Sequence, residues 1–454
     1  MNIPRIMIAA PSSGSGKTLI SCGLLGALKN KGVNIKAFKC GPDYIDPMFL
    51  RTVAGVPTEN IDLYLAGKEK MTKLFIEASK DIELALIEGV MGLYDGLGGI
   101  SSKGSAYDIA RASKTPVIMV VDAGKTGFSI AALIRGFLSY DEDELIKGVI
   151  LNRISKGFYE KIKPVIEKET GLKVLGRFSK NEKLGFDSRY LGLMLPGEVI
   201  DVKNKLEEAA LQAEDEIDIE TVIGIAKSAE EIDETKVCTD DIFEGYNGLT
   251  LAVARDEAFC FYYDANIRMF EKAGINIKYF SPLRDGKLPE NADGILLGGG
   301  YPELYTDELE ANITMRESIK NAIDKKMPSL AECGGFMYLH KEIDGKKMVG
   351  AIDAKAVKKD RLVRFGYKEI KGESGMLLKK GETVRAHEFH YYESTDNGDS
   401  CVAVKALTKE SERCMHEAPE HFWGFPHLYY PSAPCFIRHF MDEMKKYHIS
   451  RVNM

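Results

Sequence analysis

The sequence predicts an α/β protein of two domains, each a mostly parallel sheet flanked by helices. Up to about residue 200, short apolar segments alternate with amphipathic helical ones, and the same alternation resumes after residue 248. Between them the chain is strongly charged and loses this pattern. A chain of 454 residues can form two or three domains. We expect a first domain over 1–200, a helical and acidic linker over 201–247 and a second domain over 248–454.

The individual elements follow from the apolar segments and the turns that bound them. In the first domain the expected strands are 6–10 (IMIAA), 34–39 (NIKAFK), 83–89 (ELALIEG), 116–123 (PVIMVVDA), 147–152 (KGVILN) and 173–178 (KVLGRF). In the second domain the expected strands are 249–257, 275–281, 292–300 and 328–333, with helices over 266–274 and 317–326.

Composition excludes several classes of protein. The net charge of −7, from 61 Lys and Arg against 68 Asp and Glu, provides no basic stripe for nucleic acid. Residues 6–10 are too short for the core of a signal peptide, and no segment is long enough to span a bilayer, so we expect a cytoplasmic protein that binds no membrane. The eight cysteines lack CxxC spacing, so neither a zinc site nor a disulfide framework is indicated.

A loop of small residues separates the first strand from the helix that follows it. Its backbone N–H groups at a helix N-terminus are suited to phosphate, Lys17 to the terminal phosphates and the Thr18 hydroxyl to Mg²⁺. A strict phosphate-binding motif would have Gly at position 11, where this chain has Pro11. The alternative interpretation is a Ser/Gly turn that leads into a helix. The order strand, loop, GKT, helix favours a site formed by Ser13, Gly14, Ser15, Gly16, Lys17 and Thr18.

Acidic residues follow two further strands of the first domain. Asp43 and Asp46 come after segment 34–39, while Glu88 ends segment 83–89 and Asp95 lies in the next loop. Loops at the carboxyl ends of parallel strands line the ligand crevice of such sheets. Each acid taken alone could instead be a turn or cap residue. Together they are candidates for magnesium binding.

The second domain carries a candidate nucleophile. Cys333 ends an apolar strand and is followed by two glycines and a helical stretch, a turn at which a helix N-terminus would lower the pKa of the thiol. The loop 298–300 could offer N–H groups to an oxyanion. The alternative interpretation is a core cysteine. Among the histidines His387, His390 and His427, the pattern alone does not select a base.

These segments together resemble the glutamine-dependent cobyrinate a,c-diamide synthases of corrinoid biosynthesis. The resemblance is carried, in chain order, by SSGSGKT, FKCGPDYIDPMF, IEGVMGLYDG, SRYLGL, AVARDEAFCFYY, GGGYPE, AECGGFMYL, HEFHYYE and HLYY. It implies a P-loop ATP-binding domain like that of dethiobiotin synthetase, whose loop has one residue more, so that Ala10 stands where Gly is usual. It also implies a flavodoxin-like class I glutamine amidotransferase domain that keeps Cys and His but not the usual Glu.

The resemblance assigns roles to single residues. Cys333 matches the nucleophile and His427 the base, and Tyr429 stands where the usual Glu would be. Asp46 and Glu88 match magnesium ligands, together with Thr18. Asp43 and Asp95 match acids that are tied to turnover. Lys39 matches a lysine that contacts phosphate, and Asn152 lies in the segment that matches the adenine-recognising loop. Leu50, Tyr190 and Tyr429 occupy places where histidines are expected, so the substrate could differ in detail.

The implied activity is a glutamine-hydrolysing carbon–nitrogen ligase that amidates the a and c carboxylates of cobyrinate. ATP and L-glutamine are the implied co-substrates, and Mg²⁺ is the implied cofactor. The implied substrate is a tetrapyrrole, which reacts through acyl phosphate intermediates. The implied assembly is a homodimer. Ni-sirohydrochlorin or hydrogenobyrinate a,c-diamide synthase is the nearest alternative. A partition-type ATPase switch is a remote one, because such a protein has no use for the AECGG segment.

Overall fold

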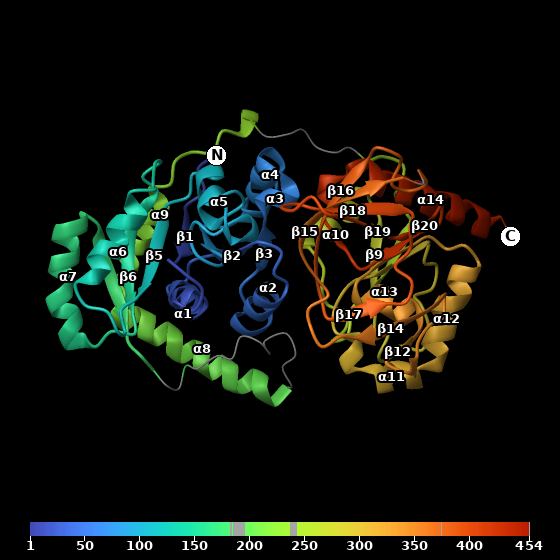
Figure 1. The fold of residues 1–454 in the computed structure, drawn as a ribbon, viewed down its shortest axis with the longest axis horizontal. Helices are drawn as coiled ribbons and strands as arrows, with labels where there is room; N and C mark the ends of the chain where they lie inside the picture. Colours follow the sequence, from blue (N-terminus) through green and yellow to red (C-terminus); the bar gives the residue numbers. More distant parts are fainter. Residues whose placement is uncertain (182–183, 185–195, 237–242, 374, 454) are drawn as a thin grey trace. The chain divides into compact units, whose positions relative to one another are not determined.

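The computed structural model describes residues 1–181, 184, 196–236, 243–373 and 375–453. The chain forms two compact units, Met1–Cys238 and Thr239–Met454, which run from blue to green and from green to red in Figure 1. Each unit is α/β with a largely parallel sheet at its centre, which confirms the predicted fold class. Among the described residues, no helix has both the length and the apolar character needed to cross a membrane.

A seven-stranded parallel sheet forms the centre of the first unit. Its order is β3 (Thr58–Ile61), β2 (Ile35–Cys40), β4 (Leu84–Glu88), β1 (Arg5–Ala9), β5 (Val117–Asp122), β6 (Ile146–Asn152) and β7 (Lys173–Phe178). In β1, Ile6 and Ile8 belong to one core cluster, and Met7 and Ala9 to the other. Burial on both faces explains the apolar runs within β1, β4, β5 and β6. The six predicted strands are present, and β3, a short and polar edge strand, was not predicted.

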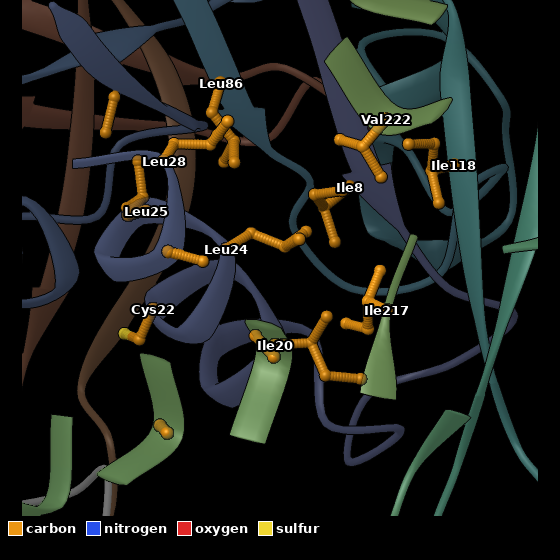
Figure 2. Close-up of a cluster of buried hydrophobic side chains, with 14 of the residues drawn as sticks. Ile8, Ile20, Cys22, Leu24, Leu25, Leu28, Leu86, Ile118, Ile217 and Val222 are labelled. Atoms are coloured by element: carbon orange, nitrogen blue, oxygen red, sulfur yellow. The ribbon is translucent and has the colours of Figure 1, made fainter. Parts of the chain in front are cut away.

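Helices cover both faces of this sheet. One face carries α1 (Lys17–Asn30), α8 (Pro196–Glu216) and α9 (Ile219–Lys227), and the other carries α4 (Lys68–Ala78), α5 (Ala106–Ala112), α6 (Ser129–Leu138) and α7 (Lys156–Thr170). Figure 2 shows side chains of α1 such as Leu24 and Leu28 packed toward Ile8 and Leu86 of the sheet. Shorter elements are α2 (Ile45–Phe49), the π-helical turn η1 (Leu50–Ala54), α3 (Leu63–Ala66), η2 (Leu97–Gly99) and η5 (Glu234–Lys236).

The segment 201–247, for which we predicted a linker, contributes two helices to the first unit. Ala209 and Ala213 of α8 are fully buried against Gly23 of α1, where a Cβ would lie 2.9 Å from the Ala209 carbonyl oxygen. Small residues thus let the two helices approach closely. Val222 of α9 joins the same core cluster (Figure 2). The buried apolar residues of α8 are not evident in the sequence because acidic residues lie between them. The first compact unit extends to Cys238.

The second unit is built on a six-stranded sheet. Its order is β20 (His416–Ala418), β21 (His421–Gly424), β11 (Ser329–Glu332), β10 (Gly294–Leu297), β8 (Thr250–Ala254) and β9 (Asn276–Phe280), and only the β20–β21 pair is antiparallel. One face packs on α10 (Asp264–Lys272) and α14 (Pro434–Val452), the other on α12 (Ile313–Asp324) and α13 (Gly334–Leu339). Shorter elements are η6 (Pro302–Leu304), α11 (Thr306–Ala311) and η7 (Tyr430–Ser432).

Two additional sheets of the second unit were not predicted. The first contains β13 (Lys346–Lys347), β12 (His340–Ile343), β14 (Ile352–Lys358) and β17 (Tyr392–Ser394). The second, antiparallel throughout, contains β19 (Ser411–Cys414), β18 (Cys401–Lys405), β15 (Arg364–Gly372), β16 (Thr383–His390) and β22 (His427–Leu428). Their strands are buried on one face only, so they carry many polar residues and lack a continuous apolar run.

Candidate functional site

In the first unit, the loop between β1 and α1 is held from the side by Asn152. The Nδ2 of Asn152, at the end of β6, donates a hydrogen bond to the carbonyl oxygen of Ser15 at 2.8 Å. Gly16 has φ 94°, and a Cβ on it would lie 2.1 Å from that Nδ2, so only glycine fits there. Ser13 and Gly14 form the exposed tip of the loop. The N–H groups at the start of α1 therefore border an open turn, which suits an anion.

Lys17 lies along this loop. Its Nζ donates hydrogen bonds to the carbonyl oxygens of Met91 at 2.5 Å and Ser12 at 3.3 Å. Burial, and secondarily repulsion from Lys39, lowers the pKa of Lys17 to about 8. An anion in the loop would offer this ammonium stronger acceptors than two carbonyl groups.

The carboxyl ends of β2 and β4 bring four predicted site residues together. Lys39 and Glu88 are register partners on these adjacent strands. The Oε1 of Glu88 accepts hydrogen bonds from the Thr18 hydroxyl at 2.8 Å and the Lys39 ammonium at 2.7 Å. Lys39 also pairs with the Oδ2 of Asp46 at 2.5 Å. Two carboxylates, a hydroxyl and an ammonium thus meet beside the first turn of α1.

This cluster fits a magnesium ion in its donor atoms. No group of three or more His, Cys, Asp or Glu side chains is arranged around one point in the described part of the chain. Magnesium, however, is commonly held by one or two carboxylates together with phosphate and water. The Oε2 of Glu88 is buried without a hydrogen-bond partner, so this carboxylate retains an acceptor for a cation. Thr18, Asp46 and Glu88 would be the protein ligands.

Asp43 and Asp95 both make local turn bonds. The Oδ1 of Asp43 accepts from the N–H groups of Ile45 at 2.8 Å and Asp46 at 3.4 Å, and the Oδ2 of Asp95 accepts from the N–H of Gly92 at 2.9 Å. Burial, and then the nearby Asp46, raises the pKa of Asp43 to about 6. Asp43 is therefore electrostatically part of the cluster as well as a turn residue.

In the second unit, three neighbouring parallel strands end at one edge and supply the predicted amidotransferase groups. Cys333 follows β11 with φ 48°, and its N–H donates to the Gly424 carbonyl at the end of β21 at 2.9 Å. The loop 298–300 follows β10. A Cβ on Gly299 would lie 2.3 Å from the Cε1 of His427, so this glycine makes room for the imidazole. Cys333, the glycine loop and His427 thus lie close together where these strands end.

The thiol and the imidazole are both held in their neutral forms. Burial raises the pKa of the Cys333 thiol, and the carboxylates of Glu303 and Glu388 add to this. The lowered pKa that we expected was wrong, because the N–H of Gly334 opposes a larger cost of desolvation. Burial, then repulsion from His387 and His390, lowers the pKa of His427 to about 3.

The geometry separates the three candidate histidines. His427 lies on β22 directly opposite His387 on β16 and beside the glycine loop. The ring of His390 stacks on Phe425 at 4.0 Å, and its Nδ1 bonds to the Tyr392 carbonyl oxygen at 2.7 Å. These positions favour His427 as the base.

Both units are similar to known protein domains. Residues 6–189 match the CobQ/CobB/MinD/ParA nucleotide binding domain, and residues 250–425 match the CobB/CobQ-like glutamine amidotransferase domain. The cobyrinate a,c-diamide synthase of Thermoplasma volcanium is 40% identical, over 98% of this chain and 98% of its own. That of Clostridium acetobutylicum is 35% identical, over 96% of this chain and 99% of its own. The chain belongs to the cobyrinate a,c-diamide synthase family.

In this member of the cobyrinate a,c-diamide synthase family, residues other than histidine stand at three positions where histidines were expected. Leu50 is 1% exposed and belongs to a core cluster of the first unit. Tyr429 is buried, and its ring packs edge-on against Tyr263 at 5.4 Å. Tyr190 lies outside the described residues. Leu50 and Tyr429 therefore contribute packing rather than charge.

One buried acid of this cobyrinate a,c-diamide synthase family member was missed by the sequence analysis. Glu332 directly precedes Cys333, and its Oε1 accepts from the Tyr430 hydroxyl at 2.6 Å while its Oε2 accepts from the Leu428 N–H at 3.3 Å. Burial raises the pKa of Glu332 to about 8, against these two bonds. It connects the nucleophile strand to the segment on either side of Tyr429. A carboxylate inside an apolar strand was the available signal.

Proposed function

We propose that this protein amidates the a and c side-chain carboxylates of cobyrinate in corrinoid biosynthesis, using ATP and glutamine, in the cytoplasm. The observation that carries the proposal is that one chain contains both a phosphate-binding loop beside a carboxylate cluster and a Cys–His site beside a glycine loop. Relatives with the name cobyrinate a,c-diamide synthase match it over nearly its whole length. The homodimer remains a prediction.

The first unit would activate the carboxylate. The loop 13–18 and Lys39 hold the phosphates of ATP, and Thr18, Asp46 and Glu88 hold Mg²⁺, which when bound neutralises phosphate charge. A substrate carboxylate oxygen attacks the γ-phosphorus, the bond to the β-phosphate oxygen breaks, and ADP leaves. The product is an acyl phosphate. This step is required because a free carboxylate has no good leaving group, whereas phosphate is one.

The second unit would supply ammonia. The thiol of Cys333 transfers its proton to His427 as sulfur attacks the side-chain amide carbon of glutamine, and N–H groups of the glycine loop stabilise the oxyanion. His427 returns the proton to the departing nitrogen, which leaves as ammonia. Water then hydrolyses the thioester to glutamate and frees the thiol. The raised pKa of the thiol and the lowered pKa of the imidazole disfavour a thiolate–imidazolium pair before glutamine binds.

Ammonia would then attack the carbonyl carbon of the acyl phosphate and expel phosphate, giving the amide. Each amide formed in this way consumes one ATP and one glutamine. Ammonia must arrive unprotonated to act as a nucleophile, which requires that it be sheltered from bulk water on its way.

The proposal is tested by offering the purified protein cobyrinate, hydrogenobyrinate and Ni-sirohydrochlorin separately, with ATP, Mg²⁺ and glutamine. We expect mass spectrometry to show a diamide from cobyrinate, with phosphate and glutamate released in equal amounts. Preferential turnover of another tetrapyrrole would transfer the assignment to that substrate. Turnover of none would overturn it.

A further inference from the structure

The Lys39 ammonium occupies a central position in the carboxylate cluster of the first unit. Its Nζ lies 2.7 Å from the Oε1 of Glu88 and 2.5 Å from the Oδ2 of Asp46. The Lys39 side chain is 5% exposed and that of Glu88 1% exposed. Lys39 is therefore an internal partner of these acids and not a surface lysine that happens to touch them.

The Lys39 ammonium balances the negative charge of several nearby carboxylates. Asp43, Asp46 and Glu88 act electrostatically on Lys39, and buried carboxylates without a counter-charge are costly. Even so, the Oε2 of Glu88 remains buried without a partner, so one ammonium does not satisfy every acceptor. These carboxylates can therefore bind a cation other than the Lys39 ammonium.

A divalent ion on these ligands would compete with Lys39 for the same oxygens. Magnesium binds oxygen at about 2.0–2.1 Å. An ion joining the Oε1 of Glu88 to the Oδ2 of Asp46 would lie within the space where the Nζ of Lys39 now contacts both atoms. Two cations cannot share that position, since their repulsion in a buried site is strong. Ion binding thus requires the ammonium to move away.

We propose that Lys39 is an internal cation that closes the divalent-ion site of the free protein and leaves it when nucleotide phosphate binds. The inference rests on the ligands named in the proposed function. Phosphate beside Lys17 and Thr18 would give the ammonium a new charged acceptor and expose the carboxylates at the same moment. Nucleotide and ion then favour each other's binding, and this coupling is reciprocal. The device would prevent the free protein from holding an ion without ATP.

The test measures Mn²⁺ binding by electron paramagnetic resonance, with the full-length protein and with Lys39→Met, in the absence of nucleotide. We expect Lys39→Met to bind Mn²⁺ about tenfold or more tightly than the wild type. Lys36→Met is the matched control, because Lys36 lies on the same strand and pairs with Glu59 at 2.6 Å. Lys36→Met should bind Mn²⁺ with the affinity of the wild type. Adding a non-hydrolysable ATP analogue should strengthen Mn²⁺ binding by the wild type and reduce the difference in Mn²⁺ affinity between the wild type and Lys39→Met.

Equal Mn²⁺ affinities of the wild type and Lys39→Met without nucleotide would overturn the inference. Lys39→Gln, which keeps hydrogen-bond donors, gives the same comparison if the Met variant does not fold. Absence of Mn²⁺ binding in every variant, even with the analogue, would overturn the magnesium ligands and the inference with them. Tight Mn²⁺ binding by Lys39→Met, together with a wild type that forms no amide from any of the three tetrapyrroles, would leave this inference standing and remove the proposed function.

Discussion

The side-chain amide of Asn152 donates a 2.8 Å hydrogen bond to the carbonyl oxygen of Ser15 across 137 positions of sequence. The end of β6 thereby fixes the loop that precedes α1. Gly16 is part of the same arrangement, because a Cβ there would collide with the amide. Asn152 thus has a structural task at the phosphate-binding loop, while its part in adenine recognition remains a prediction.

Asn152→Ala should weaken ATP binding. It leaves a buried carbonyl group without its donor, a loss of about 1–2 kcal/mol, so the KM for ATP should rise roughly tenfold. Steady-state kinetics at saturating glutamine would measure this. Asn30→Ala, which removes an exposed bond to Glu214 in the same unit, is the control. An unchanged KM in both variants would show that the bond to Ser15 does not order the loop.

Cys333→Ala should separate the two halves of the reaction. Glutamine-supported amidation should fall by about 10³-fold or more, since no other thiol replaces the nucleophile, while ammonia-supported amidation should persist. Amide formation with each nitrogen source is the measurement. Cys435→Ala, at an exposed position, should retain both activities. Loss of both activities in Cys333→Ala would contradict the scheme of two sites.

Gly299→Ala should impair glutamine hydrolysis through His427. The new Cβ would lie 2.3 Å from the Cε1 of that imidazole, so the ring must shift. We expect glutaminase activity to fall at least about tenfold, with a destabilisation of about 1–3 kcal/mol. Gly286→Ala is the control, because its Cβ would meet only the Thr314 hydroxyl oxygen, at 3.6 Å. Glutaminase activity equal in the two variants would argue against His427 as the base.

Glu332→Gln should alter how the stability of the second unit depends on pH. The pKa of Glu332 is about 8 in the folded state and 4.5 ordinarily, so the native protein binds the extra proton between these values. The free energy of unfolding of the wild type therefore falls as pH rises from about 5 to 8. The variant lacks this contribution, and its denaturation midpoints should fall less over that range. Parallel pH profiles of the two proteins would show that the carboxyl group is not protonated at neutral pH.

Periodicity and motif spacing predicted much of the fold and both groups of candidate residues. Strands such as β1 and β11 are buried throughout, are preceded by proline and are followed by glycine-containing turns, so their position was evident. The one-sided strands β15 and β16 lack that signal, and α8 hides its apolar stripe among acidic residues. Glu332 was missed because an isolated acid in a strand shows neither its burial nor its partners.

The two α/β patterns, the phosphate-binding loop and the Cys333 turn could be predicted from the sequence, because each depends on residues that are close along the chain. Which distant groups meet depends on the tertiary structure. It placed Lys39 between Glu88 and Asp46, set His427 opposite His387 and kept the Cys333 thiol neutral by burial. These properties depend on the order of strands in a sheet and on removal from water. Neither is encoded in the spacing of residues within any one segment.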